Sequence, residues 1–355
     1  MTLFSFASAQ APLPSPILEE LEDEIRQGPH RCSALSIPFS SREFEAIRAG
    51  AEQQLRDLLA LTAEFRILFL QGGATALFSL VPMNLLGEGD AADYVEAGLW
   101  SRRASKAAVA WGSIGVAADG DGRSLPRPDT WRRAAASVYC HITSNETAEG
   151  LQFHNFPDGR GSSLVADMTA DFLTRPIAMD PFGLIYASAQ KNFGVAGLTV
   201  VIIHESLLDR ARRGVPAPFD FSLQAAERSK VNTPPTFAIA VAGKMFRWLD
   251  RSGGLSEAAT RAAHRSTTLY SVIDSDAFYD CPASAEHRSH VSIRFVLQEQ
   301  GLEPAFLIDA EANGLLGLSG HPSVGGLRAS LYNATTQDAV ETLADFMNDF
   351  RRRKG

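Results

Sequence analysis

Residues 163–203 form the stretch SLVADMTADFLTRPIAMDPFGLIYASAQKNFGVAGLTVVII, in which three short apolar runs are separated by polar, glycine-containing segments. The runs SLVADM (163–168), LIYASAQ (184–190) and LTVVII (198–203) have the length and composition of buried strands. The same pattern begins nearer the N-terminus, with expected strands at 67–70 and 137–142. A glycine turn or a polar segment with helical character comes after most of these strands. Helical segments are expected at 44–61, before the first of these strands, and at 74–86, 144–150, 169–176 and 204–213.

This alternation of apolar strands and helices predicts an α/β fold, because a mostly parallel sheet needs helices on both faces. Ligands of such sheets bind beyond the carboxyl ends of the strands. We therefore look for the chemistry of this protein in the residues directly after the strands.

Composition excludes several classes of protein. The chain has 355 residues, of which 45% are hydrophobic and 21% charged, as in ordinary globular proteins. Its 41 acidic against 33 basic residues give a net charge of −8, so we expect no nucleic acid partner. No apolar run approaches the roughly 20 residues of a membrane span. The cysteines, Cys32, Cys140 and Cys281, are too few and scattered for a disulfide framework or a metal clip, and no basic segment precedes an apolar stretch at the N-terminus. We expect a cytoplasmic protein without a membrane segment or a metal site.

The pattern changes after residues 237–254 (FAIAVAGKMFRWLDRSGG), an expected helix that ends at two glycines. A long helix is expected from 255 to about 275. Shorter segments of mixed type come after it, at 289–297, 303–312, 325–333 and 336–353. This mixture predicts a smaller α+β domain. We therefore expect a large domain over 17–254 and a small C-terminal domain over 255–355.

Several familiar motifs fail. His204-Glu205 begins an HExxH pattern, but Leu208 stands where the second histidine would be. The sequence contains no phosphate-binding GxxxxGKS/T, no GxGxxG after a strand and no GxSxG elbow. Nucleotide hydrolysis, dinucleotide redox chemistry and serine esterase activity are therefore not indicated.

Lys191 directly follows an apolar strand and precedes a glycine, in the sequence YASAQKNFG. Its ammonium group is expected at the carboxyl end of that strand. A partly desolvated lysine can act as a nucleophile and form a Schiff base with a carbonyl such as that of pyridoxal phosphate (PLP). The alternative is an ordinary surface lysine.

Asp167 stands at the end of the strand SLVADM, 24 residues before Lys191, so both side chains can face one cleft. A carboxylate at the end of a buried strand needs a cation or several hydrogen-bond donors. The protonated pyridine nitrogen of PLP is such a cation, and its charge makes the ring an electron sink. The alternative is a cap on the next segment through the amides of Thr169 or Ala170.

Gly72-Gly73-Ala74-Thr75 closes one expected strand and opens a helix. Backbone N–H groups at such a helix start can bind a phosphate, although glycine turns at this position are also common without a ligand. Trp100, in YVEAGLWSRRA, can stack on a planar ring or simply pack in the core.

Together these residues resemble the phosphoserine aminotransferase family, which has PLP-dependent fold type I and belongs to the class V aminotransferases. The likeness covers nearly the whole chain. It is carried by FLQGGATALFSLVPMNLL, YVEAGLWSRRA, HITSNETAEGLQF, LVADMTADFLTRPI, FGLIYASAQKNFGVAGLTVVII, NTPPTFAIAVAGKMFRWL and SVGGLRASLYNA. The resemblance implies a large domain with a mostly parallel seven-stranded sheet.

The resemblance also implies the roles of individual residues. Lys191 forms the Schiff base, Asp167 pairs with the pyridine nitrogen, Trp100 stacks on the ring and Thr147 binds the ring 3-oxygen. The cofactor phosphate is held by Ala74, Thr75, Thr169 and Gln190. Asn232 and Thr233, in NTPP, reach the phosphate of a neighbouring subunit, which implies a homodimer with shared active sites. Arg328, in GGLRAS, binds the substrate α-carboxylate as a bidentate pair.

The sequence departs from the family at positions around the substrate. Where relatives carry a His-Arg pair, Phe39 and Ser40 stand here, and Pro322 replaces the arginine that comes after the histidine matched by His321. The N-terminal family segment FSAGPA is FASAQA (6–11) here, in the expected N-terminal segment 1–16 that packs near the active site. The missing cations are those with which the family binds the distal anionic group of its substrates.

We therefore expect a PLP-dependent aminotransferase that transfers an amino group between an L-amino acid and a 2-oxo acid, with a substrate less anionic than phosphoserine. The first alternative is the phosphoserine:2-oxoglutarate aminotransferase of serine biosynthesis, with Arg42 or Arg102 replacing the missing cations. A second is another PLP reaction on the same scaffold, such as that of a lyase or decarboxylase. A third is a non-catalytic binding protein.

Overall fold

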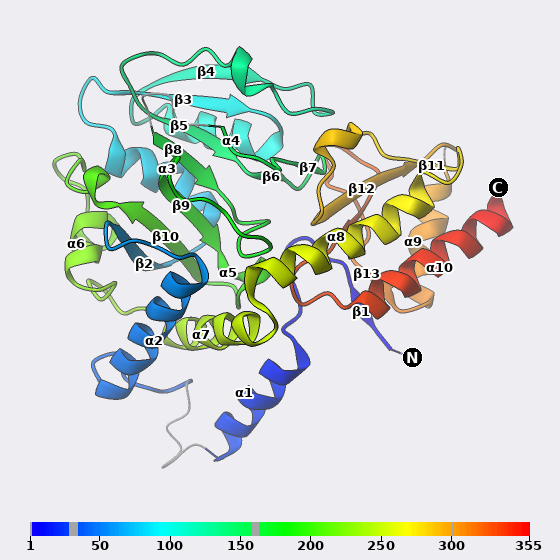
Figure 1. Ribbon diagram of the computed structural model, residues 1–355, viewed down its shortest axis with the longest axis horizontal. Helices are drawn as coiled ribbons and strands as arrows, with labels where there is room; N and C mark the ends of the chain where they lie inside the picture. The colour runs from blue at the N-terminus through cyan, green and yellow to red at the C-terminus, as the bar shows by residue number, and fades with distance from the viewer. Residues whose placement is uncertain (1, 28–34, 158–162, 300) are drawn as a thin grey trace.

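The central feature of the computed structural model, which describes residues 2–27, 35–157, 163–299 and 301–355, is one large sheet (Figure 1). In the described residues seven strands form it in the order β2-β10-β9-β8-β5-β3-β4. Their bounds are β2 Phe65–Gln71, β3 Ala91–Glu96, β4 Ser113–Asp119, β5 Ser137–Thr143, β8 Ser163–Asp167, β9 Phe182–Ser188 and β10 Leu198–His204. The expected α/β fold with a seven-stranded sheet is confirmed.

Strand direction in this sheet is parallel except at β10, which runs antiparallel to both of its neighbours, β2 and β9. Strands β8 and β9 are therefore parallel neighbours, and their carboxyl ends lie at the same edge. Asp167 ends β8, and Lys191 lies three residues beyond the end of β9. This arrangement brings the two residues to one side of the molecule.

Helices cover both faces of the sheet, because successive residues of each strand point to opposite faces. In β2, Ile67 and Phe69 belong to one core cluster, and Leu68 and Leu70 to the other. Helices α2 and α7 pack together on the first side, and α3 and α4 on the second. The helices in the first part of the chain are α1 Ser15–Gln27, α2 Arg42–Leu58, α3 Ala74–Leu85, α4 Leu99–Ala108, α5 Ala189–Asn192, α6 Phe221–Ala226 and α7 Thr236–Arg251.

Three of the expected helical segments are wrong. Residues 169–175 form turns and bends, because Leu173 has a positive φ of 61° and Pro176 comes next after this segment. After β10 only a short 3-10 turn forms, Glu205–Leu207, and Asp209 also has a φ of 61°. Residues 144–150 contribute to a two-stranded hairpin of β6 (Asn145–Glu146) and β7 (Leu151–Gln152). Further 3-10 turns are Pro128–Thr130, Ala217–Phe219 and Ala285–His287.

Among its described residues, the C-terminal part of the chain has its own small sheet, with the order β11-β12-β14, and three α-helices. In Figure 1 these elements, coloured yellow to red, lie beside the large sheet. Their bounds are α8 Gly254–Ile273, β11 Tyr279–Asp280, β12 Ser292–Leu297, α9 Leu302–Ala312, β14 Leu327–Ser330 and α10 Gln337–Lys354. The expected boundary between the two domains stays a prediction.

The N-terminal segment contacts both the C-terminal elements and the large sheet. Strand β1 (Phe4–Ser5) pairs in parallel with β13 (Leu315–Leu316), and the Ala11 amide donates to the Gln190 carbonyl at 2.9 Å. The chain thus passes the carboxyl edge of the large sheet before helix α1 begins. Within the described ranges, we find no helix with both the length and the hydropathy to cross a bilayer.

Candidate active site

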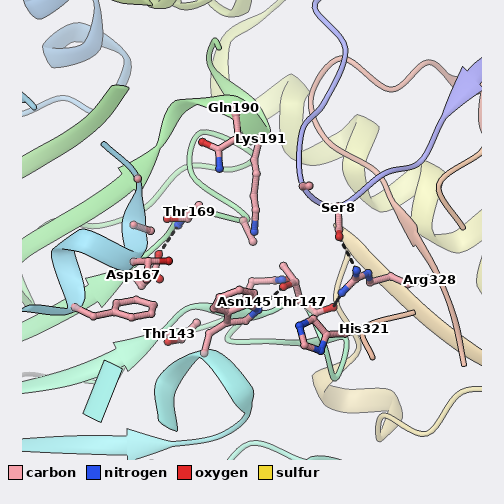
Figure 2. A pocket seen from close by; sticks show the side chains of 17 residues that line it. Ser8, Thr143, Asn145, Thr147, Asp167, Thr169, Gln190, Lys191, His321 and Arg328 are labelled. Atoms are coloured by element: carbon pink, nitrogen blue, oxygen red, sulfur yellow. Dashed lines mark hydrogen bonds between the residues drawn. The ribbon is translucent and has the colours of Figure 1, made fainter. Parts of the chain in front are cut away.

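A cavity of about 390 Å³ opens at the carboxyl ends of β8 and β9, next to the starts of α3 and α4 (Figure 2). It contains most of the residues that the sequence singles out. Its lining consists of Ser8, Ala9, Gly73, Ala74, Thr75, Phe78, Trp100, Thr143, Asn145, Thr147, Asp167, Thr169, Ala170, Gln190, Lys191, His321 and Arg328.

Lys191 and Asp167 share this cavity. Figure 2 shows Asp167 and Arg328 on opposite sides of it, with the Lys191 side chain entering between them. Burial lowers the pKa of Lys191 from 10.5 to about 8, against the opposing influence of the Asp167 carboxylate. An amine with this pKa is partly neutral near pH 7–8, as a nucleophile or general base requires.

Asp167 has a second contact besides the cavity. Its Oδ1 accepts a hydrogen bond from the Thr169 amide at 2.9 Å, the local capping that the sequence left open as an alternative. Residues 169–175 form no helix, so the bond closes a turn and leaves the carboxylate facing the cavity. Burial raises the pKa of Asp167, opposed by Thr169 and by the charge of Lys191. A cation in the cavity would lower the cost of keeping this carboxylate ionised.

The start of α3 provides a site for an anion. Gly73 occupies the N-cap position and has no side chain with which to cap the helix. The Ser188 hydroxyl accepts a hydrogen bond from the Ala74 amide at 2.9 Å, and the Thr169 hydroxyl accepts one from the Ser188 amide at 3.2 Å. Hydroxyl groups and the helix N-terminus therefore meet at one end of the cavity, a favourable arrangement for a phosphate.

Trp100 forms a wall of the cavity and is held by a hydrogen bond. Its indole Nε1 donates to Thr147 Oγ1 at 2.7 Å. The ring of His321 approaches the indole edge-on, with centroids 6.1 Å apart, and the Arg103 guanidinium carbon lies 5.0 Å from the indole centroid. The indole is thus fixed in place and surrounded by cationic or titratable groups.

Arg328, on β14, reaches the cavity from the C-terminal sheet. Its Nη1 donates to the Thr147 carbonyl at 2.9 Å and its Nη2 to Ser8 Oγ at 2.5 Å. The residue is 6% exposed, and within the described parts of the chain it forms no ion pair. Burial lowers its pKa. A buried guanidinium without a carboxylate is favourable only if a ligand supplies the negative charge.

Four residues of the expected site lie outside this cavity. Phe39 and Ser40 are exposed in a turn before α2, and Thr233 is exposed in the segment between α6 and α7. Asn232 Oδ1 accepts from Gln224 Nε2 at 3.2 Å, and the Thr233 carbonyl accepts from Gln71 Nε2. This chain alone does not bring them to its own Lys191.

Phe78, Thr143 and Asn145 also line the cavity and were not singled out as site residues by the sequence. Ser8 and Ala9 belong to the N-terminal segment expected near the active site, and Ala170 was named only as a possible capping partner of Asp167. Ser8 contacts Arg328 although 320 residues separate them, and only tertiary structure creates that contact. The polar run TSN at the end of β5 was a usable signal for Thr143 and Asn145, because it lies at the carboxyl end of a strand of the same sheet.

The residues present fit PLP. A buried carboxylate shares the cavity with a lysine of lowered pKa, a helix start whose N-cap glycine has no side chain lies at one end, and an immobilised indole forms a wall. The fold and this site define a PLP-dependent enzyme of fold type I.

Comparison with known proteins leads to the same class. The family model described as Aminotransferase class-V matches residues 3–343, so the chain belongs to the class-V aminotransferase family. It is 43% identical to the phosphoserine aminotransferase of Azotobacter vinelandii (strain DJ), with 99% of each chain covered. It is also 43% identical to that of Laribacter hongkongensis (strain HLHK9), with 100% of both chains covered.

Solved structures agree with these sequence relatives. The phosphoserine aminotransferase from Bacillus circulans subsp. alkalophilus superposes with a TM-score of 0.96 at 36% identity, covering 99% of this chain and 98% of that one. The PLP-bound enzyme from Trichomonas vaginalis gives 0.93 at 32%, covering 98% and 99%. The expected family, fold type, aminotransferase activity and PLP dependence are thereby confirmed.

Proposed function

We propose that this aminotransferase uses L-phosphoserine as amino donor and a 2-oxo acid, 2-oxoglutarate, as acceptor. The observation that carries the proposal is Arg103 beside the Trp100 wall of the cavity, a cation that forms no ion pair among the described residues and is available to a distal phosphate. The buried Arg328 binds the α-carboxylate, which every amino donor has. Full-length similarity to relatives named phosphoserine aminotransferase supports this donor over a less anionic one.

Different residues of the cavity would bind different parts of the cofactor. The start of α3, with Thr75 and Thr169, would bind its phosphate, Asp167 would hold the proton on the pyridine nitrogen, and Trp100 would stack on the ring. When bound, PLP supplies an electron sink for the negative charge that develops on the substrate α-carbon.

Lys191 and Arg328 act on the substrate. Lys191 Nζ, with its pKa of about 8, serves as the base that removes the α-proton and as the acid that returns a proton. Arg328 binds the α-carboxylate, and its two fixed bonds orient the guanidinium plane. Holding the carboxylate in this way directs the α C–H bond toward Lys191.

The distal part of the substrate would meet the rim formed by His321 and Arg103. Arg103 lies against Trp100. Burial lowers the pKa of His321, and the charges of Arg328 and Arg103 lower it further. In the described ranges Arg103 forms no ion pair, so its charge is available to a phosphate. Arg102 is a poorer replacement for the missing cations, because it donates to Asp119 at 2.6 Å.

A less anionic donor is a second candidate, favoured by a specific observation. Phe39, Ser40 and Pro322 stand where the family resemblance implies cationic side chains, and all three are exposed here. If a second copy of this chain brings Phe39 and Ser40 to the cavity, it adds no charge there.

A homodimer is part of the proposal. Asn232 and Thr233 lie away from the cavity of their own chain, which supports a role in the active site of a neighbouring copy. Sedimentation velocity of the purified protein should show a dimer, and Asn232→Ala should weaken PLP binding without changing the bonds within one chain's cavity. A monomer that retains full turnover would contradict this part.

The donor is tested with the PLP-loaded protein and 2-oxoglutarate, by mass spectrometry of the glutamate formed from L-phosphoserine, L-alanine or L-serine. We expect kcat/KM for phosphoserine to exceed that for alanine by about 100-fold or more, as one or two charge-assisted hydrogen bonds imply. Lys191→Ala is the control for background transfer. A preference for alanine or serine would establish the second candidate and exclude phosphoserine.

A further inference from the structure

The first turn of α4 is capped in an unusual way. Its N-cap residue is Gly98, which has no side chain, and the free amides of the turn are bound by two glutamates from the hairpin segment 145–152. Glu146 Oε2 accepts from the Trp100 amide at 2.9 Å and its Oε1 from the Ser101 amide at 2.8 Å, while Glu149 Oε1 accepts from the Leu99 amide at 2.9 Å. The positive end of the helix dipole also stabilises carboxylates at this position.

The two carboxyl groups are buried and close together. Glu146 is 0% and Glu149 5% exposed. A Cβ added to Gly98 would lie 2.6 Å from Glu149 Oε2 and 2.7 Å from Glu146 Cδ, so both carboxyl groups lie next to the same glycine and leave no room for a side chain there. Burial raises the pKa of both, that of Glu146 to about 7. Burying two carboxyl groups side by side costs free energy, which indicates that the first turn of α4 must be placed accurately.

The glutamates belong to the segment that holds the cavity wall. Thr147 directly follows Glu146, its hydroxyl accepts from Trp100 Nε1 at 2.7 Å, and its carbonyl accepts from Arg328 Nη1 at 2.9 Å. Trp100 is therefore fixed twice to residues 146–147, by its backbone amide and by its indole. Any shift of Glu146 moves the indole and the Thr147 hydroxyl together.

The same segment is tied to the small domain. The Ser289 amide donates to the Gly150 carbonyl at 2.9 Å, and a Cβ on Gly150 would lie 3.0 Å from Arg294 Cβ. The charges of Arg102 and Arg294 oppose the effect of burial on the pKa of Glu149. The segment that carries Glu146 and Glu149 is thus also held by residues of the C-terminal part of the chain.

We propose that Glu146 and Glu149 are positioning residues for the cofactor: they lock the first turn of α4 to residues 146–150 and so set the place of the Trp100 indole and the Thr147 hydroxyl. This inference rests on the proposed roles of Trp100 and Thr147 in holding PLP. It does not depend on which amino donor is used.

The test measures PLP binding rather than turnover. In Glu146→Gln one carboxylate oxygen becomes an NH2 group that faces a backbone amide donor. We expect the dissociation constant of PLP to rise by about 10-fold or more and the visible circular dichroism of the bound cofactor to fall. Asp220→Asn is the matched control, because Asp220 caps α6 through two amides away from the cavity. It should leave both readouts unchanged.

A double-mutant cycle separates positioning from a general loss of stability. In a Trp100→Ala background, Glu146→Gln should change PLP affinity by a smaller factor than in the unsubstituted protein, because one of the two groups that Glu146 positions is gone. An unreduced effect in that background, or an unchanged affinity in the single variant, overturns the proposal. If Glu146→Gln does not fold, Gly98→Ala, whose new Cβ displaces both carboxyl groups, is put through the same cycle with the same criteria. If the unsubstituted protein binds PLP normally but does not turn over phosphoserine, that result would instead count against the proposed donor.

Discussion

Replacing Arg328 with lysine tests the central claim about substrate binding. The guanidinium makes two bonds on the protein side, to Thr147 O at 2.9 Å and to Ser8 Oγ at 2.5 Å, which leaves its remaining N–H groups for a carboxylate. Lysine keeps the positive charge but cannot hold the two protein oxygens and a bidentate carboxylate at once. The variant therefore keeps the positive charge but no longer orients the substrate carboxylate.

The size of the effect depends on the bonds lost. A hydrogen bond to a charged group contributes about 1.5–3 kcal/mol, so losing one or two predicts a fall in kcat/KM of roughly 100-fold. The loss should be similar for every amino donor, because all share the α-carboxylate. PLP affinity should stay within about threefold, since Arg328 reaches the substrate side of the cavity.

The assay is steady-state transfer to 2-oxoglutarate with phosphoserine and with a second donor, alongside a PLP titration. Arg265→Lys is the matched control: Arg265 is 3% exposed and donates to the carbonyl groups of Asn333 and Thr335, outside the active-site cavity. It should lower stability and leave kcat/KM intact. If Arg328→Lys keeps near-normal kcat/KM, or loses activity with only one donor, the assignment of the α-carboxylate to Arg328 is wrong.

Three other side chains of the site can be tested in the same protein. Asp167→Asn keeps an oxygen for the Thr169 amide but removes the negative charge, so kcat should fall by about 100-fold or more while urea unfolding changes little; an unaltered kcat would contradict the role of the carboxylate. The rate at which cofactor-free protein captures PLP should rise with pH through about 8 and then level off, because burial lowers the pKa of Lys191; a rise that continues toward 10.5 would mean an exposed, unperturbed amine. Ser188→Ala leaves the Ala74 amide without its acceptor and should cost about 1–2 kcal/mol in free energy of unfolding, measured by urea denaturation; no change would show that water replaces the hydroxyl.

Local sequence was a good guide to the strands and to the site residues at their carboxyl ends. Short apolar runs identified β2, β5, β8, β9 and β10, because burial on both faces leaves little choice but apolar side chains. The same runs do not indicate strand direction, so only the structure shows that β10 runs antiparallel to its two neighbours. The expected helix at 169–176 failed for a related reason: its composition suits a helix, but a left-handed residue at Leu173 and the nearby Pro176 prevent one.

The cofactor residues could be predicted because they lie at strand ends and turns, where a short motif fixes both the backbone and the side chain. Asp167 and Lys191 are of this kind, since parallel neighbouring strands bring their carboxyl ends together. The contributions of Ser8 and of the Glu146–Glu149 pair could not be predicted in this way. Each contacts a residue that is distant in the chain, and the hydrophobic periodicity of the sequence does not indicate which residue that is.

The sequence by itself determined the α/β sheet, the lysine and aspartate at its edge, and the family to which the chain belongs, because these depend on hydrophobic patterning and on short motifs with fixed geometry. Only the tertiary structure decided that Arg328 is buried without a counter-ion among the described residues and that two glutamates cap the helix of Trp100. Burial and charge pairing depend on which distant segments exclude water from a side chain, and that is settled when the whole chain packs.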